Sequence, residues 1–394
     1  MNITNLILFS YLIAFNSFFA STAIGAARIH IKEIDFSSVA PKNYVLEDNY
    51  GGIGISHSGW VYHAIDGYYK DVEIEDTAVF RFHTITGEKE FLGTLRDISL
   101  LEGNLLPGEE ISKIHAPICE HKNIIYFASH PFHKKTDVRR GGHFYSFNPN
   151  TKRWTDLSKY DPDGISVPGQ GIITMDVFRK HDKLIGFTFP KGELVTFDLK
   201  TRKTTNHGRP ILKDPSNVSR HIIVTDAGKV YFSYSGNNKP LYEFDINAKA
   251  FKKTGFILGD GWLCGVAYNS TRTKAYFVDR LGDLYLLNIK TEKFSKLGKI
   301  APDSHSSYKY RFFHGLIISN DDKKLYSLPE MDTGSEKFYI LYEYNVEKKE
   351  KKAYLTDLKG QVVGGVSSKN GYLYFHNHYY KKKYCKLIQI SVIE

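Results

Sequence analysis

Short runs of alternating apolar and polar residues recur along the chain and predict β-strands. The run Leu241-Tyr242-Glu243-Phe244 has the period of two that is typical of a half-buried strand. A turn and a group of basic residues follow it, and this order is repeated elsewhere. The copies read VFRFHTITGEKEFLG from Val79, FYSFNPNTKRWTDLS from Phe144, LVTFDLKTRKTTNHG from Leu194, LYEFDINAKAFKKTG from Leu241, LYLLNIKTEKFSKLG from Leu284 and LYEYNVEKKEKKAYL from Leu341.

An additional apolar strand, with Tyr at its centre in most cases, recurs at intervals that settle near 45–50 residues, the repeat length of a β-propeller. The central residue of this strand falls at Tyr62, Tyr126, Ile185, Tyr231, Tyr276, Tyr326 and Tyr374. The sequence therefore predicts an all-β fold, a seven-bladed β-propeller of four-stranded antiparallel blades, as a single domain over residues 27–394. We expect Lys386–Ile393 to be an outer strand and Arg28–Ile34 to help close the ring.

The first 26 residues resemble a secretory signal peptide. Leu6–Ala20 is largely apolar, and small residues follow it, so we expect cleavage near residue 26 and a secreted or periplasmic protein. No second apolar run is long enough to span a membrane. Three cysteines, Cys119, Cys264 and Cys385, are too few and too far apart to indicate a disulfide framework.

The formal net charge of +10 narrows the choice of partners. Many of the basic residues fall in turns, where they form either a solvated rim or a surface that attracts a polyanion. The chain has no recognition-helix pattern and no RNA-binding signature, so we do not expect nucleic acid as a partner. An acidic polysaccharide fits the charge.

Insertions lengthen the early repeats at Asp66–Asp76, Leu101–Pro117 and His130–Gly142. Such insertions map to loops, often on the binding face of a propeller. They hold most of the densest polar cluster of the chain, which comprises His115, His121, His130, His133, Arg139, Arg140 and His143. Because His130 ends one apolar strand and His143 begins the next, we expect both imidazoles to face the same pocket.

Several chemistries are compatible with this cluster, besides the simple alternative of surface histidines in a basic loop. Zinc ligation by His130, His133 and His143 lacks a close-spaced HxxxH or CxxC motif. A Ser-His-Asp triad lacks a nucleophile elbow. Acid–base catalysis by His with a neutralising Arg is the combination that β-elimination of a uronic acid polymer requires.

Four stretches carry a resemblance to a known group of enzymes. They resemble secreted seven-bladed propeller polysaccharide lyases, above all the ulvan lyases of polysaccharide lyase families 24 and 25. The stretches read SKIHAPICEHKNIIYFASH up to His130, GGHFYSFNPNTKRWTDLS over 141–158, GQGIITMDVFRKHDKLIGFTFPKGELVTFDLKT over 169–201 and SRHIIVTDAGKVYF over 219–232.

The resemblance implies cleavage of a sulfated, uronate-containing polysaccharide by β-elimination. The resemblance assigns the abstraction of the proton to His130 and His143. It assigns the neutralisation of the carboxylate to Arg220, with Arg209 as the second choice. The family also uses a catalytic Tyr upstream of this Arg. This chain has no Tyr between Tyr160 and Tyr231, and His207 is the residue that we expect in its place.

The resemblance also implies a set of residues around the reacting sugar and a metal site. The residues expected to bind substrate are His115, Lys134, Arg139, Arg140 and Arg209. No cofactor is expected for the chemistry, whereas a structural zinc is conceivable at Cys264 and His314, which otherwise are a buried thiol and a core imidazole. We expect a monomer. The alternative function is a non-catalytic propeller that binds an acidic glycan or a protein partner.

Overall fold

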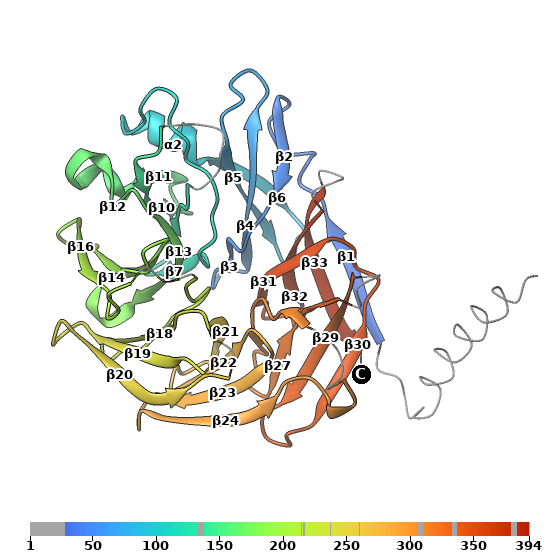
Figure 1. The fold of residues 1–394 in the computed structure, drawn as a ribbon. Helices are drawn as coiled ribbons and strands as arrows, with labels where there is room; N and C mark the ends of the chain where they lie inside the picture. The colour runs from blue at the N-terminus through green and yellow to red at the C-terminus, as the bar shows by residue number, and fades with distance from the viewer. Residues whose placement is uncertain are drawn as a thin grey trace, which may run out of the picture.

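The computed structural model consists of seven antiparallel sheets of at least four strands each, arranged as blades around a central axis (Figure 1). This confirms the predicted fold, a seven-bladed β-propeller. The predicted signal segment, residues 1–26, lies outside the described residues. The described residues are 28–131, 138–213, 215, 217–236, 238–259, 261–305, 310–332, 337–379 and 384–393.

We number the blades 1 to 7 in chain order, and each runs from an inner strand to an outer one. The inner strands are β3 (Ile53–Ile55), β7 (Cys119–His121), β13 (Gly171–Phe178), β17 (Ile223–Val224), β21 (Leu263–Tyr268), β26 (Ile317–Ile318) and β31 (Gln361–Ser367). The second strands are β4 (Trp60–Tyr69), β8 (Ile124–Ala128), β14 (Lys183–Phe189), β18 (Lys229–Phe232), β22 (Lys274–Asp279), β27 (Lys324–Ser327) and β32 (Leu373–Tyr379). The third strands are β5 (Asp76–His83), β10 (Phe144–Asn148), β15 (Leu194–Asp198), β19 (Pro240–Asp245), β23 (Asp283–Asn288), β29 (Lys337–Asn345) and β33 (Tyr384–Ile393). The outer strands are β6 (Lys89–Thr94), β11 (Arg153–Asp156), β16 (Lys203–Gly208), β20 (Ala250–Ile257), β24 (Lys293–Lys299), β30 (Lys351–Leu355) and β1 (Arg28–Ile34).

The two kinds of repeated strand predicted from the sequence occupy fixed places in the blades. Every marker residue from Tyr62 to Tyr374 lies in a second strand, and every copy of the basic repeat begins in a third strand. The repeat therefore reports the register of the blades, because equivalent strands pack in equivalent places around the ring.

The last blade joins the two ends of the chain. β1 pairs antiparallel with β33, from Arg28 opposite Ile393 to Ile34 opposite Leu387. The expectation that Arg28–Ile34 helps to close the ring is confirmed. The expectation that Lys386–Ile393 is an outer strand is wrong, because β1 covers that edge and β33 is the third strand of blade 7. The shared blade ties the first residues of the ring to the last and leaves no open end between them.

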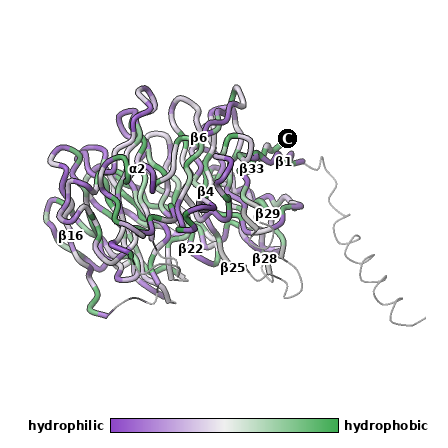
Figure 2. The backbone as a smooth tube through the Cα atoms, turned by 90° about the horizontal axis from the view of Figure 1, so that it is seen from above, coloured by the Kyte–Doolittle hydropathy of each residue, from purple (hydrophilic) through white to green (hydrophobic). Residues whose placement is uncertain are grey.

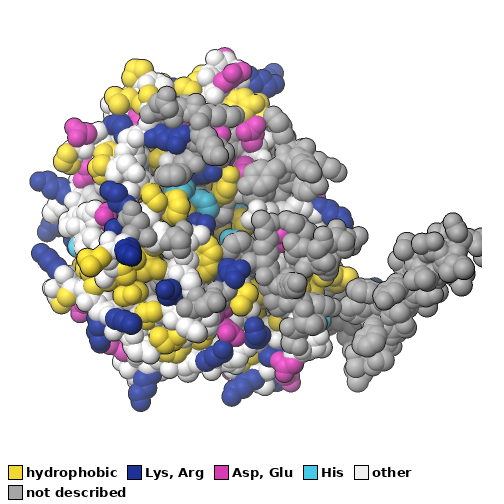
Figure 3. Space-filling view, viewed as in Figure 1, with side chains coloured by type: hydrophobic (Ala, Val, Ile, Leu, Met, Phe, Trp, Pro, Cys, Tyr) yellow, Lys and Arg dark blue, Asp and Glu magenta, His cyan; other side chains and the backbone are white. Residues whose placement is uncertain are grey.

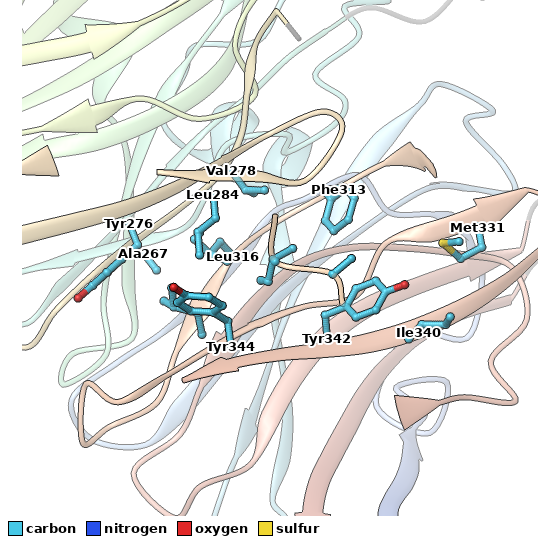
Figure 4. Close-up of a cluster of buried hydrophobic side chains, with 13 residues drawn as sticks. Ala267, Tyr276, Val278, Leu284, Phe313, Leu316, Met331, Ile340, Tyr342 and Tyr344 are labelled. Atoms are coloured by element: carbon cyan, nitrogen blue, oxygen red, sulfur yellow. The ribbon is translucent and has the colours of Figure 1, made fainter. Parts of the chain in front are cut away.

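Apolar side chains fill each of the seven interfaces between neighbouring blades, with one cluster of described residues at each. Since side chains alternate along a strand, each blade supplies both of its interfaces. In β8, Ile125 and Phe127 pack toward blade 1, and Tyr126 and Ala128 pack toward blade 3. Figure 2 shows the resulting alternation of hydropathy along the backbone, and Figure 4 shows the cluster between blades 5 and 6.

A few elements lie outside the regular blades. β2 (Tyr44–Asp48) extends blade 1 beside β4, and β9 (Gly141–Gly142) pairs with β12 (Val167–Pro168). β25 (Tyr310–Phe312) and β28 (Glu330–Asp332) extend blade 6, while α2 (Leu95–Leu101) follows β6 in the inserted segment between blades 1 and 2. The three cysteines are free thiols. Within the described ranges, no helix combines the length and apolarity that a membrane crossing requires.

The shared blade provides a test of ring closure. Ile388 in β33 is fully buried between blades 6 and 7, whereas Ile393 at the end of the same strand is 56% exposed. We expect Ile388→Ala to lower the free energy of unfolding by roughly 2–5 kcal/mol, because it leaves a cavity in an interblade core. Ile393→Ala is the matched control and should change it by about 0.5 kcal/mol or less. Denaturant unfolding measures both; equal losses would contradict the assigned packing.

Candidate functional site

Polar side chains gather at one end of the central axis, around the segments that enter the inner strands. Tyr50, His115, Arg220 and His314 each stand shortly before an inner strand, and His130 follows β8 at the same end. These positions coincide because all inner strands run in the same direction, and the loop between the second and third strands emerges at the end where the inner strand begins. Figure 3 shows His side chains near the centre of one face, with Lys and Arg side chains around them.

His115 lies at the centre of this group. Its ring centroid is 4.9 Å from that of Tyr50 and 5.3 Å from that of His130. The Lys113 ammonium lies 4.1 Å from the centroid of the Tyr50 ring, in a cation–π arrangement. The inserted segment between blades 1 and 2 thus brings Lys113 and His115 to the centre of the face, where they meet residues from blades 1 and 2.

His130 is held against the next blade by its backbone and by a glycine. Its N–H donates to the Lys113 carbonyl at 2.8 Å, which joins the end of β8 to the inserted segment. A Cβ on Gly171, at the start of β13, would lie 2.0 Å from His130 Nδ1. Because no side chain fits in that space, glycine is required at position 171 for His130 to pack here. His130 is 5% exposed, whereas His115 is partly exposed.

The surroundings of both imidazoles favour the neutral form. Burial, together with the positive charges of Lys113 and Arg220, lowers the pKa of His130 to about 3. Burial, and after it the charge of Arg220, holds the pKa of His115 well below its ordinary value. At neutral pH both rings therefore have a nitrogen lone pair available to accept a proton.

The Arg220 guanidinium is, with the Lys113 ammonium, a positive charge that acts on both rings. It lies 5.2 Å from the centroid of the Trp262 ring, and burial lowers its pKa. Among the described residues, no acidic side chain forms an ion pair with it. A partly buried guanidinium without a carboxylate partner favours binding of an anion from outside the chain, because a planar fork of N–H donors matches a carboxylate.

His143 lies on the other face of blade 2, in contrast to the expectation that it shares a pocket with His130. The two residues belong to paired strands, in which His130 continues the row of Ala128 and His143 continues the row of Tyr145. The first row packs toward blade 3 and the second toward blade 1. The His143 ring accordingly stacks on Tyr145, with centroids 5.7 Å apart.

His143 is fully buried and paired with acids. Its Nδ1 lies 3.0 Å from Asp156 Oδ2, and its Nε2 lies 3.8 Å from Glu109 Oε1. Although burial alone would lower it, these carboxylates raise the pKa of His143 to about 9. At neutral pH the ring is an imidazolium held between two buried acids. This arrangement joins blade 2 to the inserted segment that carries Glu109 and leaves no free base.

Arg139 and Arg140, expected to bind substrate, are also engaged inside the protein. Arg140 Nε donates to Glu109 Oε1 at 2.8 Å, and Arg139 Nε donates to Glu110 Oε2 at 3.1 Å. Both glutamates are almost fully buried. The two arginines compensate buried charge.

His207 and Arg209 have partners of their own outside the group at the axis. His207, in the outer strand β16, has its Nε2 2.9 Å from Thr196 Oγ1, and its ring centroid is 4.6 Å from that of Phe244. Arg209 donates to the Lys191 carbonyl at 2.7 Å. Neither of these contacts joins them to His130 or Arg220. The residue beside His130 is instead Phe189, with ring centroids 5.7 Å apart, and its side chain has no hydroxyl.

Four predicted residues remain. Cys264 lies in the inner strand β21, His314 stands shortly before the inner strand β26, and the other two are outside the described residues. Cys264 is fully buried, and its carbonyl accepts a hydrogen bond of 2.9 Å from the N–H of Gly315, next to His314. Within the described ranges, however, no group of three or more His, Cys, Asp or Glu side chains is arranged to hold a metal. The structural zinc at Cys264 and His314 stays an expectation, and we derive no step through it. His133 and Lys134 lie outside the described residues.

Comparison with known proteins bears on the fold. No family model matches the chain, and no curated protein matches it. A similar solved structure is the β-propeller domain of Cps50 (Swd1) from Myceliophteria thermophila, with a TM-score of 0.60 and 8% sequence identity over 89% of this chain and 98% of that chain. The chain is a seven-bladed β-propeller. At this identity the likeness shows the fold alone.

Three residues of the site, Tyr50, Lys113 and Trp262, were not found from the sequence. Tyr50 and Trp262 stand shortly before β3 and β21, in the same place as His115 and Arg220 in their own blades. An alignment of the segments that precede the predicted inner strands would have found both residues. Reading the densest run of histidines instead favoured residues that are close in sequence, which the alternation of strands then separates.

The charged state of His143 predicts a stability that depends on pH. A folded-state pKa of about 9, above the ordinary value of 6.5, stabilises the fold fully below pH 6.5, and this contribution is lost as the pH rises through 9. We expect His143→Gln to lower the free energy of unfolding by about 3 kcal/mol at pH 6 and by less at pH 10, because the wild type itself loses the ion pair. Denaturant unfolding at both values measures this.

The control for this experiment is His30→Gln, which changes an exposed imidazole on β1. It should have little effect at either pH. A His143→Gln effect that is equal at pH 6 and pH 10 would mean that His143 is neutral in the folded protein.

Proposed function

We propose that this protein is an exported polysaccharide lyase that cleaves a uronate-containing, sulfated glycan by β-elimination. The observation that carries the proposal is the arrangement of two neutral imidazoles beside the Arg220 guanidinium, which has no acidic partner among the described residues. A neutral base and an uncompensated cation are the two groups that abstraction of a proton next to a carboxylate requires. The resemblance to ulvan lyases and the net charge of +10 support the same class of substrate.

In this proposal Arg220 binds the uronate carboxylate and stabilises the negative charge that develops on it. An imidazole removes the proton on the carbon next to the carboxylate, and the electron pair forms a carbon–carbon double bond. The bond from the next carbon to the glycosidic oxygen breaks, and that oxygen takes a proton. The products are a chain end and a 4,5-unsaturated uronate, with no oxidant or reductant consumed.

We assign the base to His115, with His130 beside it, and not to His143. His115 is partly exposed and neutral, while His130 is 5% exposed and packs behind it. Tyr50, whose ring lies 4.9 Å from that of His115, has the hydroxyl that Phe189 lacks and is the proposed acid. His143, as a buried imidazolium between Asp156 and Glu109, has a positioning role, because it anchors the strand that follows the loop after His130.

A second function is a non-catalytic propeller that binds an acidic glycan through the same cations. Phe189 beside His130 favours it, because a phenyl ring donates no proton and catalysis then depends on Tyr50 as the acid. The likeness to a Swd1 propeller domain is compatible with either function, since propellers have many unrelated activities.

The proposal is tested by incubating the protein with ulvan and other uronate polymers and following the absorbance of the unsaturated product. We expect His115→Ala to lower kcat/KM by roughly 10²–10⁴-fold and Arg220→Ala by roughly 10²–10³-fold. The controls are His30→Ala and Arg153→Ala, which remove an exposed imidazole and an exposed guanidinium on outer strands and should retain the wild-type rate. Glycan binding without product from any polymer would support the non-catalytic function.

The pH dependence of this activity follows from the same imidazoles. The base must be neutral, and the pKa values of His115 and His130 lie below the ordinary value of 6.5. We therefore expect the acid limb of kcat/KM to fall below pH 6.5, with full activity retained at that pH. An acid limb at or above pH 6.5 would exclude these two residues as the base.

A further inference from the structure

The central channel continues to the opposite end of the propeller, where it has a second, separate group of charged residues. The channel encloses a cavity of about 400 Å³. Near this end its lining includes His57, Glu120, Arg179, Tyr268, Asn269 and Arg272. β13 begins beside His130 and ends just before Arg179, and a strand advances roughly 3.3 Å per residue. Arg179 is therefore far from the proposed catalytic group.

Arg179 lines this cavity without a partner of its own. Its Nη1 atom is buried and forms no hydrogen bond, and no acidic side chain among the described residues forms an ion pair with it. Burying a charged donor without a partner is unfavourable, because the group loses its hydration and gains nothing in return. An acceptor from outside the chain that enters the channel and accepts a hydrogen bond from Nη1 lowers the free energy of the folded protein.

Arg272 reaches the same region from blade 5. Its Nη2 lies 3.3 Å from Asp176 Oδ2 and donates to the Val224 carbonyl at 3.3 Å, and its guanidinium lies 3.6 Å from the centroid of the Tyr268 ring. Its Nε atom is buried and forms no hydrogen bond. These contacts hold the guanidinium plane in a fixed orientation, and its buried Nε donor is unused.

Asp176 is the carboxylate that bonds directly to Arg272. Asp176 accepts hydrogen bonds from Arg272 and from the Tyr268 hydroxyl, the latter at 3.2 Å. Both arginines and Asp176 act on the ionisation of Cys119, which places all three charges around the same part of the channel wall. Asp176 therefore compensates Arg272, on which the charge of Asp226 also acts, whereas no acidic side chain among the described residues forms an ion pair with Arg179. Glu120, farther along the wall, is occupied by His57, whose Nδ1 lies 2.6 Å from Glu120 Oε2.

We propose that this end of the channel binds a small oxyanion of the phosphate or sulfate class, held by Arg179 and Arg272. Guanidinium groups bind such anions through two parallel N–H donors, and the Arg272 plane is already fixed by Tyr268 and Asp176. A free anion and an anionic substituent on a larger molecule present the same oxygens. The cavity of about 400 Å³ admits the free ion whole, so inorganic phosphate and inorganic sulfate are the first probes.

The experiment is titration of the full chain with sodium phosphate and with sodium sulfate, followed by calorimetry and by the unfolding temperature, at constant ionic strength adjusted with sodium chloride. We expect saturable binding and a rise in unfolding temperature with at least one of the two anions. Arg179→Gln should weaken binding by roughly tenfold or more, because it removes a charge-assisted donor. Lys180→Gln, at the exposed neighbouring position, is the matched control and should bind as the wild type does.

Further variants separate this site from the proposed catalytic group. Arg272→Lys keeps the charge and loses the fork of donors, and it should bind several-fold more weakly. His115→Ala should retain full anion affinity whatever it does to glycan cleavage. The proposal is overturned if chloride alone gives the same rise in unfolding temperature, or if Arg179→Gln and Arg272→Lys both bind like the wild type. It is also overturned if Lys180→Gln loses as much affinity as Arg179→Gln.

Discussion

Apolar packing between neighbouring blades is the constraint on which the rest of the structure depends. Each blade has a neighbour on both faces, so both rows of alternating side chains must be apolar along the middle of each strand. The described residues satisfy this with one buried cluster at every interface. Every blade has two neighbours only when the ring is closed. β1 closes the ring by adding the outermost strand to the blade that contains β33.

The same alternation decides the chemical state of residues at the strand ends. His130 and His143 flank one loop, yet one continues the row that faces blade 3 and the other the row that faces blade 1. His130 meets cations and remains neutral, and His143 meets Asp156 and Glu109 and is charged. Two residues of the same type, a few positions apart, therefore have opposite electrostatic environments, because interblade packing separates them.

The axis of the propeller brings together residues that no blade holds alone. At one end, Tyr50, His115, His130 and Arg220 come from three different blades, with His115 and His130 both in blade 2. At the other end, Arg179 and Arg272 come from blades 3 and 5. The fold by itself does not indicate a function, and the likeness to a Swd1 propeller at 8% identity shows the fold alone. What distinguishes this chain is the placement of guanidinium groups at both ends of the channel, Arg220 at one end and Arg179 and Arg272 at the other.

The repeated strands determined the fold from the sequence alone. A period near 45–50 residues, with Tyr at the centre of most second strands, specified seven blades because each blade must bury the same two faces. His130 was predicted from its place at the end of an apolar strand, His115 from the histidine-rich cluster and Arg220 from the resemblance to the lyases. Tertiary structure alone decided that His143, Arg139 and Arg140 are occupied by buried acids, since Glu109 and Glu110 lie far from them in sequence. It also decided that Tyr50 and Trp262 join the site, because residues from different blades meet only when the ring is closed.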